Sequence, residues 1–193
     1  MKKYELTSET KIVFGHILYR IKALSSFGCV SAGDLGGFLE SEKNLSQNGN
    51  AWVSGDAEVF GDAEVSGDAE VSGNARVSGN AWVSGNAEVF GDARVSGNAE
   101  VSGDAEVFGN AEVSEIGAIF WIGAIGSRND TATFFRCRDG SIKVVCGCFF
   151  GNLDEFAKKV RKTHGDNDHA KVYMLAIEMA KIRIGDKKEK TEE

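Results

Sequence analysis

The chain has 193 residues, 24 glycines, no proline and a net charge of −7. Abundant glycine without proline excludes a collagen-like chain and favours tight turns at fixed intervals. Residues 50–127 carry two Lys or Arg and thirteen Asp or Glu, whereas residues 1–49 and 128–193 are net +1 and +3. Because phosphate contacts need Lys or Arg, we expect no direct nucleic-acid binding by the acidic middle.

Residues 1–48 predict an N-terminal β cap and the entry to a coil. Lys11–Phe14 and Ile17–Ile21 are apolar runs on either side of a tight turn, which is typical of a hairpin. The end of a β-helix exposes unpaired strand edges, and we expect the hairpin to cover them. The polar start has no apolar core of a signal peptide, and no stretch reaches the ~20 apolar residues of a membrane span. We therefore expect a cytoplasmic protein with reduced thiols and no membrane contact.

Residues 49–126 contain a six-residue repeat, Gly, Asp or Asn, Ala, x, Val, x. Alanine and valine alternate with the x positions, so they share one side of a strand and the x residues share the other. Gly followed by Asp or Asn is turn chemistry. Each hexapeptide therefore predicts a short strand and a corner, and Ile119 and Ile125 continue the phase. Eleven valines keep the register: Val53, Val59, Val65, Val71, Val77, Val83, Val89, Val95, Val101, Val107 and Val113.

This pattern resembles the hexapeptide repeat of left-handed parallel β-helices. The resemblance implies that three hexapeptides form one triangular coil, so that residues 18 apart stack on rungs about 4.8 Å apart. We predict a mainly β fold: a left-handed parallel β-helix of about four coils, with an N-terminal β-hairpin cap and a C-terminal cap of a β-hairpin and two α-helices. A right-handed helix is the lesser alternative.

Stacking allows the outward residues of each face to be assigned. The first face carries Trp52, Glu70, Glu88 and Glu106 beside Ser54, Ser72, Phe90 and Phe108. The second carries Glu58, Arg76, Arg94 and Glu112 beside Phe60, Ser78, Ser96 and Ser114. The third carries Glu64, Trp82 and Glu100 beside Ser66, Ser84 and Ser102, followed by Ala118 and Phe120. Glu58 over Arg76 and Arg94 over Glu112 are ordinary surface pairs.

The first face is the candidate binding site. Like charges on adjacent rungs repel, and an exposed apolar patch usually marks a contact. We predict a docking face for a basic partner, formed by Glu70, Glu88, Glu106, Phe90 and Phe108. Two alternatives stay open: a solvated acidic face whose aromatic residues a sister subunit covers, and a rod that imitates the charge of a nucleic-acid duplex.

Residues 127–185 predict an α+β cap domain. Asp139-Gly140 marks a hairpin turn, Asn152 is a candidate N-cap, Gly165 ends the first helix, and Asp166 or Asn167 caps a second one. Residues 186–193 are charged and expected to be disordered. The apolar residues of the second helix follow helical spacing: Val172, Leu175, Ala176, Met179 and Ile182.

Three stretches resemble a family of hexapeptide-repeat proteins common in phages and prophages of gut bacteria. The resemblance covers nearly the whole chain and implies a phage gene product that acts in a bacterial cytoplasm, but it implies no activity. The stretches are KYELTSETKIVFGHILYRIKAL, AGDLGGFLESEKNLSQNGNAWV and FFRCRDGSIKVVCGCFFGNLDEFAKKVRKTHGDNDHAKVYMLAIEMAKIRI.

We expect no enzyme, cofactor or metal. Left-handed β-helix acyltransferases use a histidine of the coil, whereas His16, His164 and His169 all lie outside the repeat. Cys146-Gly147-Cys148 is expected to place both thiols on one face of a strand, a weaker zinc pattern than C-x₂-C. Buried reduced cysteines are the simpler interpretation.

The sequence favours a non-catalytic binding or scaffold protein, a homo-oligomer that inhibits a host defence or nucleic-acid-processing protein through its acidic face. The alternatives are an acyltransferase and an oligomeric sponge for a small nucleotide-like ligand. The sponge would use basic residues of the C-terminal cap: Arg136, Lys143, Lys158, Lys159, Arg161 and Lys162.

Overall fold

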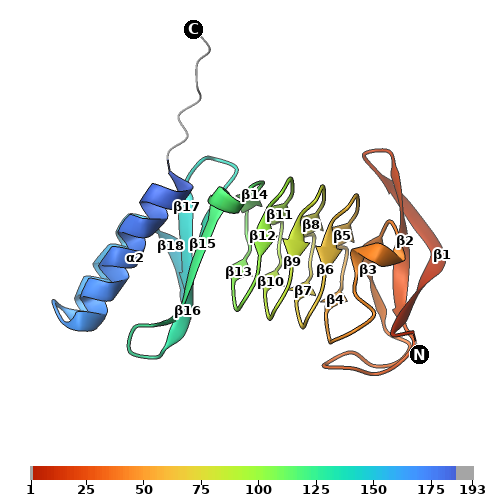
Figure 1. Ribbon diagram of the computed structural model, residues 1–193, viewed down its shortest axis with the longest axis horizontal. Coiled ribbons are helices and arrows are strands. Elements are labelled where there is room, and N and C mark those ends of the chain that lie inside the picture. Colours follow the sequence, from red (N-terminus) through yellow and green to blue (C-terminus); the bar gives the residue numbers. More distant parts are fainter. Residues whose placement is uncertain (1, 186–193) are drawn as a thin grey trace, which may run out of the picture. The chain divides into compact units, whose positions relative to one another are not determined.

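The structure is a computed structural model that describes residues 2–185. The chain divides into two compact units, Met1–Ile116 and Gly117–Glu193, which we call the solenoid unit and the C-terminal unit. The fold is mainly β, with a β-solenoid of about four turns, a C-terminal antiparallel sheet and two helices (Figure 1). The prediction of a parallel β-helix is confirmed, and its left-handed sense stays a prediction.

The solenoid is built from eleven two-residue strands, one in each hexapeptide. Strands three apart in sequence pair in parallel, so that Glu88 is in register with Glu70 and Glu106. The strands are β4 (Trp52–Val53), β5 (Glu58–Val59), β6 (Glu64–Val65), β7 (Glu70–Val71), β8 (Arg76–Val77), β9 (Trp82–Val83), β10 (Glu88–Val89), β11 (Arg94–Val95), β12 (Glu100–Val101), β13 (Glu106–Val107) and β14 (Glu112–Val113).

Small inward side chains and glycine corners explain this coil. The alanines and valines of the repeat are at most 1% exposed. Each rung donates backbone hydrogen bonds to the next, as from Glu70 N to Ala87 O at 2.9 Å. The corner glycines have positive φ, +67° at Gly73, where a Cβ would also stand 3.1 Å from the nitrogen of Gly91. Glycine is therefore required both for the turn and for the close approach of the rungs.

Polar side chains at the corners form ladders between rungs. Asn74 Nδ2 donates to Asp92 Oδ1 at 3.1 Å, which gives these corner side chains a structural role. The same bond joins Asn86 to Asp104 at 2.8 Å. Asparagine above aspartate gives a donor over an acceptor and avoids two stacked carboxylates.

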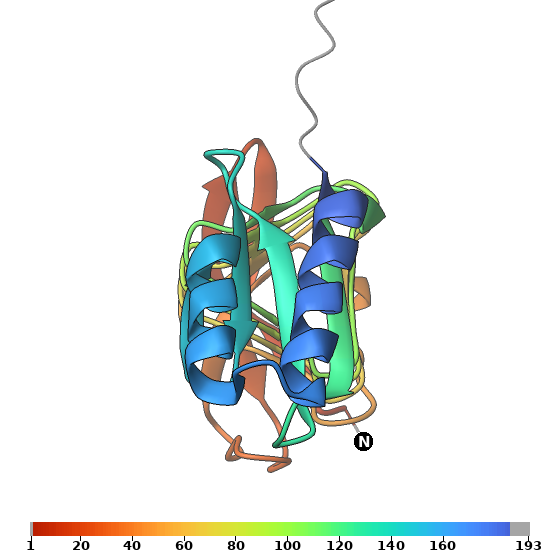
Figure 2. The same cartoon turned by 90° about the vertical axis from the view of Figure 1, so that its left-hand side faces the viewer.

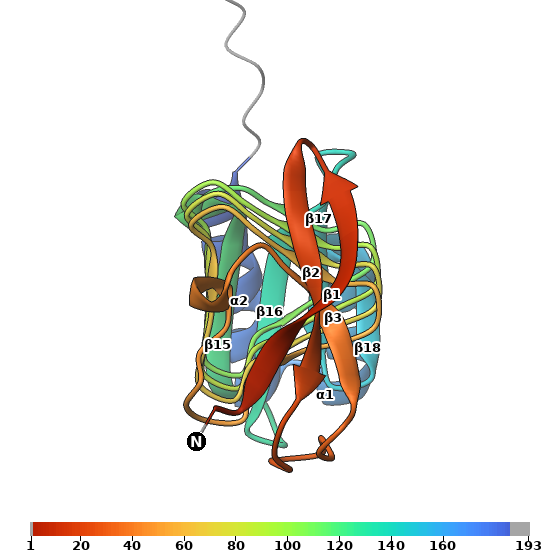
Figure 3. The ribbon, with the colours of Figure 1, turned by 90° about the vertical axis from the view of Figure 1, so that its right-hand side faces the viewer.

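The N-terminal hairpin extends one sheet of the solenoid (Figure 3). Strands β1 (Tyr4–Val13) and β2 (His16–Ala23) pair antiparallel through a Phe14-Gly15 turn, and β3 (Leu35–Leu39) then pairs in parallel with β5. The short helix η1 (Glu42–Asn44) follows. The β1-β2-β3-β5-β8-β11-β14 order confirms the predicted hairpin and shows that it continues the second face.

The prediction that the β-helix continues to residue 126 is wrong. Residues 117–126 do not form another coil. Instead η2 (Ile116–Ala118) leads into β15 (Ile119–Ile125), which pairs antiparallel with β16 (Asp130–Arg136). The corners of the repeat need glycine at positive φ, but Glu115 and Trp121 stand at the next two corner positions. Without those glycines the backbone takes an extended path.

The C-terminal unit is a four-stranded antiparallel sheet with two helices on one face (Figure 2). β15 and β16 are followed by β17 (Ile142–Cys146), β18 (Phe149–Asn152), α1 (Leu153–His164) and α2 (Asp168–Ile184). The Asn152 side chain accepts a hydrogen bond from Glu155 N, and Asn167 accepts one from Ala170 N. These N-caps and the end of α1 at Gly165 confirm the predicted boundaries. The expected disorder of residues 186–193 lies outside the described residues.

The predicted second helix is confirmed as α2, and the residues that follow helical spacing lie mostly on its exposed side. Of the residues with helical spacing, only Ala176 is buried, whereas the large apolar ones are exposed. Tyr173, Ile177 and Ala180 instead lie in the buried core of this unit, together with Phe134 of the sheet and Phe156 of α1. The spacing shows that the residues share a side of the helix, but both sides of α2 carry apolar residues, so the pattern does not say which one is covered.

Candidate functional site

The acidic face lies on the sheet β4-β7-β10-β13 and consists of Glu70, Glu88, Glu106, Phe90 and Phe108. Parallel pairing without a register shift places the three glutamates on successive rungs, as predicted. Glu70 and Glu88 are exposed, whereas Glu106 is half-buried and already engaged in a contact. The open part of the ladder is therefore Glu70 and Glu88.

Neither Glu70 nor Glu88 has an ion-pair partner among residues 2–185. Two carboxylates about one rung apart repel by roughly 1 kcal/mol in water, and by more when solvent is excluded. The second face differs, because there Arg76 Nε lies 2.6 Å from Glu58 and Lys11 lies 2.9 Å from it. A cation supplied from outside would relieve the repulsion on the acidic face.

Phe90 and Phe108 form the apolar part of the acidic face. Their rings stack with centroids 4.6 Å apart and an interplanar angle of 16°. Both are half-buried, and they occupy the position that Ser54 and Ser72 hold on the earlier rungs. Aromatic residues that contact each other but stay partly in water are a common anchor for a second protein.

The N-terminal end of this face, at Trp52, differs from the sequence prediction. Trp52 was expected to point outward, but it is 7% exposed. Phe27 and Tyr4 cover it, with ring centroids 5.4 Å and 6.3 Å away. Phe60 on the second face is likewise only 6% exposed, against Leu18. The hairpin and the loop before β3 therefore cover the first coil on two sides.

A hollow of ≈ 560 Å³, the acidic hollow, opens beside Glu70. It is lined by Trp52, by the loop at Cys29 and by the carboxyl groups of Asp34 and Asp68. Asp34 accepts a hydrogen bond from Ser31 N at 2.8 Å, and Asp68 accepts two from Asn50, both at 3.0 Å. None of the described lining residues is Lys or Arg. Sequence reasoning missed the hollow, because it depends on where the loop of residues 24–34 lies.

The six basic residues of the alternative site do not come together. Arg136 donates to the carbonyl oxygens of Ile184 and Gly185 and so binds the C-terminal end of α2, where a cation is favourable. Lys143 lies over the ring of Phe150. The remaining four are exposed residues of α1 around its buried Phe156 and Val160: Lys158, Lys159, Arg161 and Lys162.

Lys159 lines a hollow of ≈ 250 Å³. Arg128, His164, Ser127 and Thr163 also line it, together with aromatic residues that include Phe149 and Tyr173. Basic groups and aromatic rings in one hollow are suited to an anionic ring compound, although Arg128 already lies 3.2 Å from Asp130.

The cysteines do not form the predicted arrangement of two thiols on one strand face. β17 ends at Cys146, and Gly147 has a φ of +55°, so the chain turns before Cys148. Cys146 is buried with its sulfur 3.7 Å from the Tyr173 hydroxyl, whereas Cys148 is exposed. Burial raises the pKa of the Cys146 thiol, which makes it unreactive. Within residues 2–185, no three His, Cys, Asp or Glu side chains form a group that could hold a metal ion.

The geometry defines a β-solenoid protein with three unequal faces. A protein-family model described as the YdcK β-solenoid repeat matches residues 69–85, a stretch of about one coil. No curated protein matches the chain. In the part of the chain that the structure describes, no helix combines the length and apolarity that crossing a bilayer requires.

Proposed function

We propose that this chain is a non-catalytic binding protein whose acidic face docks on a basic surface of another protein. The observation that carries the proposal is the pair Glu70 and Glu88, exposed on adjacent rungs without an ion-pair partner in residues 2–185. Lys or Arg side chains of a partner would neutralise both carboxylates. Complementary charge of this kind speeds association and selects the partner.

Two neighbouring features support docking rather than simple solvation. The stacked Phe90 and Phe108 supply a rigid apolar contact beside the carboxylates. The acidic hollow next to Glu70 is large enough for a Lys or Arg side chain. Backbone hydrogen bonds join each rung of this face to the next, as from Glu88 N to Ala105 O at 2.9 Å, so the face is rigid and little entropy is lost on binding.

We further propose a phage or prophage origin, action in the bacterial cytoplasm, and inhibition of a host defence or nucleic-acid-processing protein. The support is the resemblance of the three flanking and cap stretches to phage hexapeptide-repeat proteins, and the charge of the repeat. Proteins that bind nucleic acid present Lys and Arg to phosphates, and such surfaces complement a row of carboxylates.

The test compares two double charge reversals in the full chain. Glu70→Lys with Glu88→Lys changes the acidic face, and Glu64→Lys with Glu100→Lys makes the same charge change on the third face. Each immobilised chain is incubated with a gut-bacterial lysate, and the retained proteins are quantified by mass spectrometry. We expect one protein to be retained at least about tenfold less by the first variant than by the wild type or the second variant.

Equal retention by both variants would contradict the proposal, as would loss of retention in the second variant alone. Circular dichroism and thermal unfolding show whether each variant keeps the fold. Because all four glutamates are exposed, we expect all three chains to unfold at similar temperatures.

A small anionic ligand is the second candidate, and the hollow at Lys159 favours it. The same retained fraction from the lysate would then contain a metabolite, and Lys159→Ala would lose it. Because Lys159 lies in the C-terminal unit, the acidic-face variant would keep that ligand.

A further inference from the structure

Helix α2 carries an exposed apolar stripe, Val172, Leu175, Met179 and Ile182, which we call the α2 stripe. These side chains are 43%, 64%, 50% and 83% exposed. The opposite side of the helix already packs on the sheet of the C-terminal unit. A surface helix normally turns polar residues toward water, so four large apolar residues in one row indicate a second contact.

The spacing of the α2 stripe specifies the kind of contact. Its members are three, four and three residues apart, which is the a/d pattern of two heptads. Val172 and Met179 take the a positions, and Leu175 and Ile182 take the d positions. Such a narrow row is typical of a coiled-coil seam, and valine at a with leucine at d in the first heptad favours a parallel pair.

The charges beside the α2 stripe favour a parallel pair of identical helices. In this register Glu178 takes a g position and Arg183 the e position of the next heptad. In a parallel pair, g of one helix faces that e position of the other. Glu178, which pairs with Lys181 of its own helix at 2.8 Å, then meets the guanidinium group of the partner's Arg183, whose Nε donates to Ile119 O at 3.4 Å. An antiparallel pair in full overlap would instead bring the two Glu178 carboxylates to the same level.

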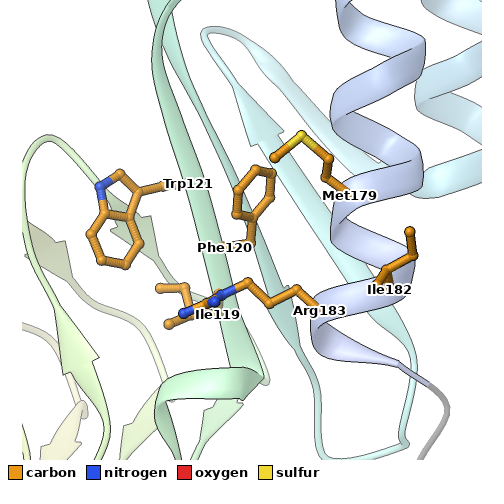
Figure 4. Close-up of a pocket in the computed structure, with 6 residues that line it drawn as sticks. All are labelled: Ile119, Phe120, Trp121, Met179, Ile182 and Arg183. Atoms are coloured by element: carbon orange, nitrogen blue, oxygen red, sulfur yellow. The ribbon is translucent and has the colours of Figure 1, made fainter.

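A hollow of ≈ 450 Å³ widens the contact at the C-terminal end of α2. It is lined by Met179, Ile182 and Arg183 from the helix, and by Ile119, Phe120 and Trp121 from β15 (Figure 4). Phe120 points toward Met179, whereas Trp121 points away from the helix (Figure 4). The seam is only two heptads long, and this apolar surface adds area to it.

We propose that two copies of this chain dimerise through α2, which forms a parallel two-helix coiled coil along the α2 stripe. The dimer is self-complementary, since each copy supplies the same row of residues and the same Glu178 and Arg183. The proposal uses the C-terminal unit alone and is independent of the acidic face.

The first test measures the mass of the full chain by sedimentation equilibrium over a wide concentration range. We expect the wild type to be a dimer, and the Leu175→Glu, Ile182→Glu variant to bind its copy at least about 100-fold more weakly, since each glutamate would place an unpaired charge in the seam. The matched control is Ile12→Glu, Ile17→Glu, which changes two residues of the hairpin that are 74% and 50% exposed. We expect this control to dimerise like the wild type.

The second test determines orientation. Val172→Cys, in a chain whose exposed Cys29 and Cys148 are replaced by serine, should form a disulfide-linked dimer on oxidation only when the helices are parallel. Separately, Glu178→Arg should weaken the dimer roughly tenfold, and adding Arg183→Glu should restore it, because the pair is then reversed rather than broken.

A wild-type chain that is monomeric at every concentration overturns the proposal. So does a dimer that survives Leu175→Glu, Ile182→Glu or dissociates in the hairpin control. A dimer that depends on the stripe, but in which the Val172→Cys variant forms no disulfide link on oxidation, overturns the parallel arrangement. Unchanged circular dichroism of each variant shows that loss of the dimer is not loss of the fold.

Discussion

The solenoid unit and the C-terminal unit reach a buried core by different routes. In the solenoid, each rung contributes the same alanines and valines, and each rung bonds to the next one along the coil. In the C-terminal unit, large residues such as Phe134, Phe156 and Tyr173 come from three separate elements and form a single core that is not repeated. A repeat therefore leaves its outward positions free to vary, whereas the second unit relies on particular side chains.

The largest expected effect is in the C-terminal unit. Phe134→Ala removes a fully buried ring that packs against Phe120 and Phe156, and should destabilise this unit by about 3–5 kcal/mol. Hydrogen exchange should show lost protection in β16 and β17, while the rungs of the solenoid keep theirs. The control Phe150→Ala changes a ring that is 46% exposed, and should cost much less. Equal loss of protection in the rungs would contradict the claim that the two units have independent cores.

A corner glycine should give the next largest effect. Gly85 has a φ of +69°, and a Cβ there would stand 2.8 Å from the nitrogen of Gly103. Gly85→Ala should therefore cost about 2–3 kcal/mol, from both the turn and the rung contact. Gly140 has a φ of +77° with open space around it, so Gly140→Ala isolates the cost of the turn, about 1 kcal/mol. Chemical denaturation measures both values, and equal costs would contradict the role assigned to rung packing.

The smallest expected effect is a pH dependence of the free energy of unfolding, which arises from Lys3 beside the first coil. Lys3 is 5% exposed, and its Nζ donates to Ala51 O at 2.8 Å. Burial lowers the pKa of Lys3 to about 8, although Asp68 opposes the shift. Between pH ~8 and ~10 the unfolded chain thus binds more protons than the folded chain, and stability should rise by about 1 kcal/mol after allowance for solvent screening.

Above pH ~10 the trend should reverse. Burial raises the pKa of Tyr4, whose hydroxyl donates to Leu45 O, so that the tyrosine ionises first in the unfolded chain. The free energy of unfolding, measured by denaturant from neutral to alkaline pH, should therefore pass through a maximum. Lys3→Met should remove the increase in the free energy of unfolding between pH ~8 and ~10. A wild-type curve that falls steadily from pH ~8 would contradict this account.

The parts that could be predicted from sequence depend on local or repeated patterns. The phase of Val53 to Val113 determines the rungs and the neighbours of every outward residue. Asn152 and Gly165 mark helix ends through bonds within one turn. The sequence also held the signal for the end of the coil, because the corner glycines stop before Glu115.

The parts that could not be predicted depend on contacts between distant segments. Trp52 looks like any outward residue of the repeat, and it is buried because Tyr4 and Phe27 reach it from the N-terminal region. The acidic hollow needs the same loop. Both sides of α2 carry apolar residues. The side that packs is the one whose Tyr173 and Ile177 share a buried core with Phe134 of the sheet. Patterns along one element do not contain that information.

Site-specific photo-crosslinking tests the binding face most directly. Phe90 is replaced by a photoreactive phenylalanine, and the control places the same group at Trp82, which is 49% exposed on the third face. The account predicts that illumination in a host lysate links the chain to one protein from position 90, and that the Glu70→Lys, Glu88→Lys change abolishes the product. A product that forms equally well from position 82, or survives the charge reversal, would contradict it.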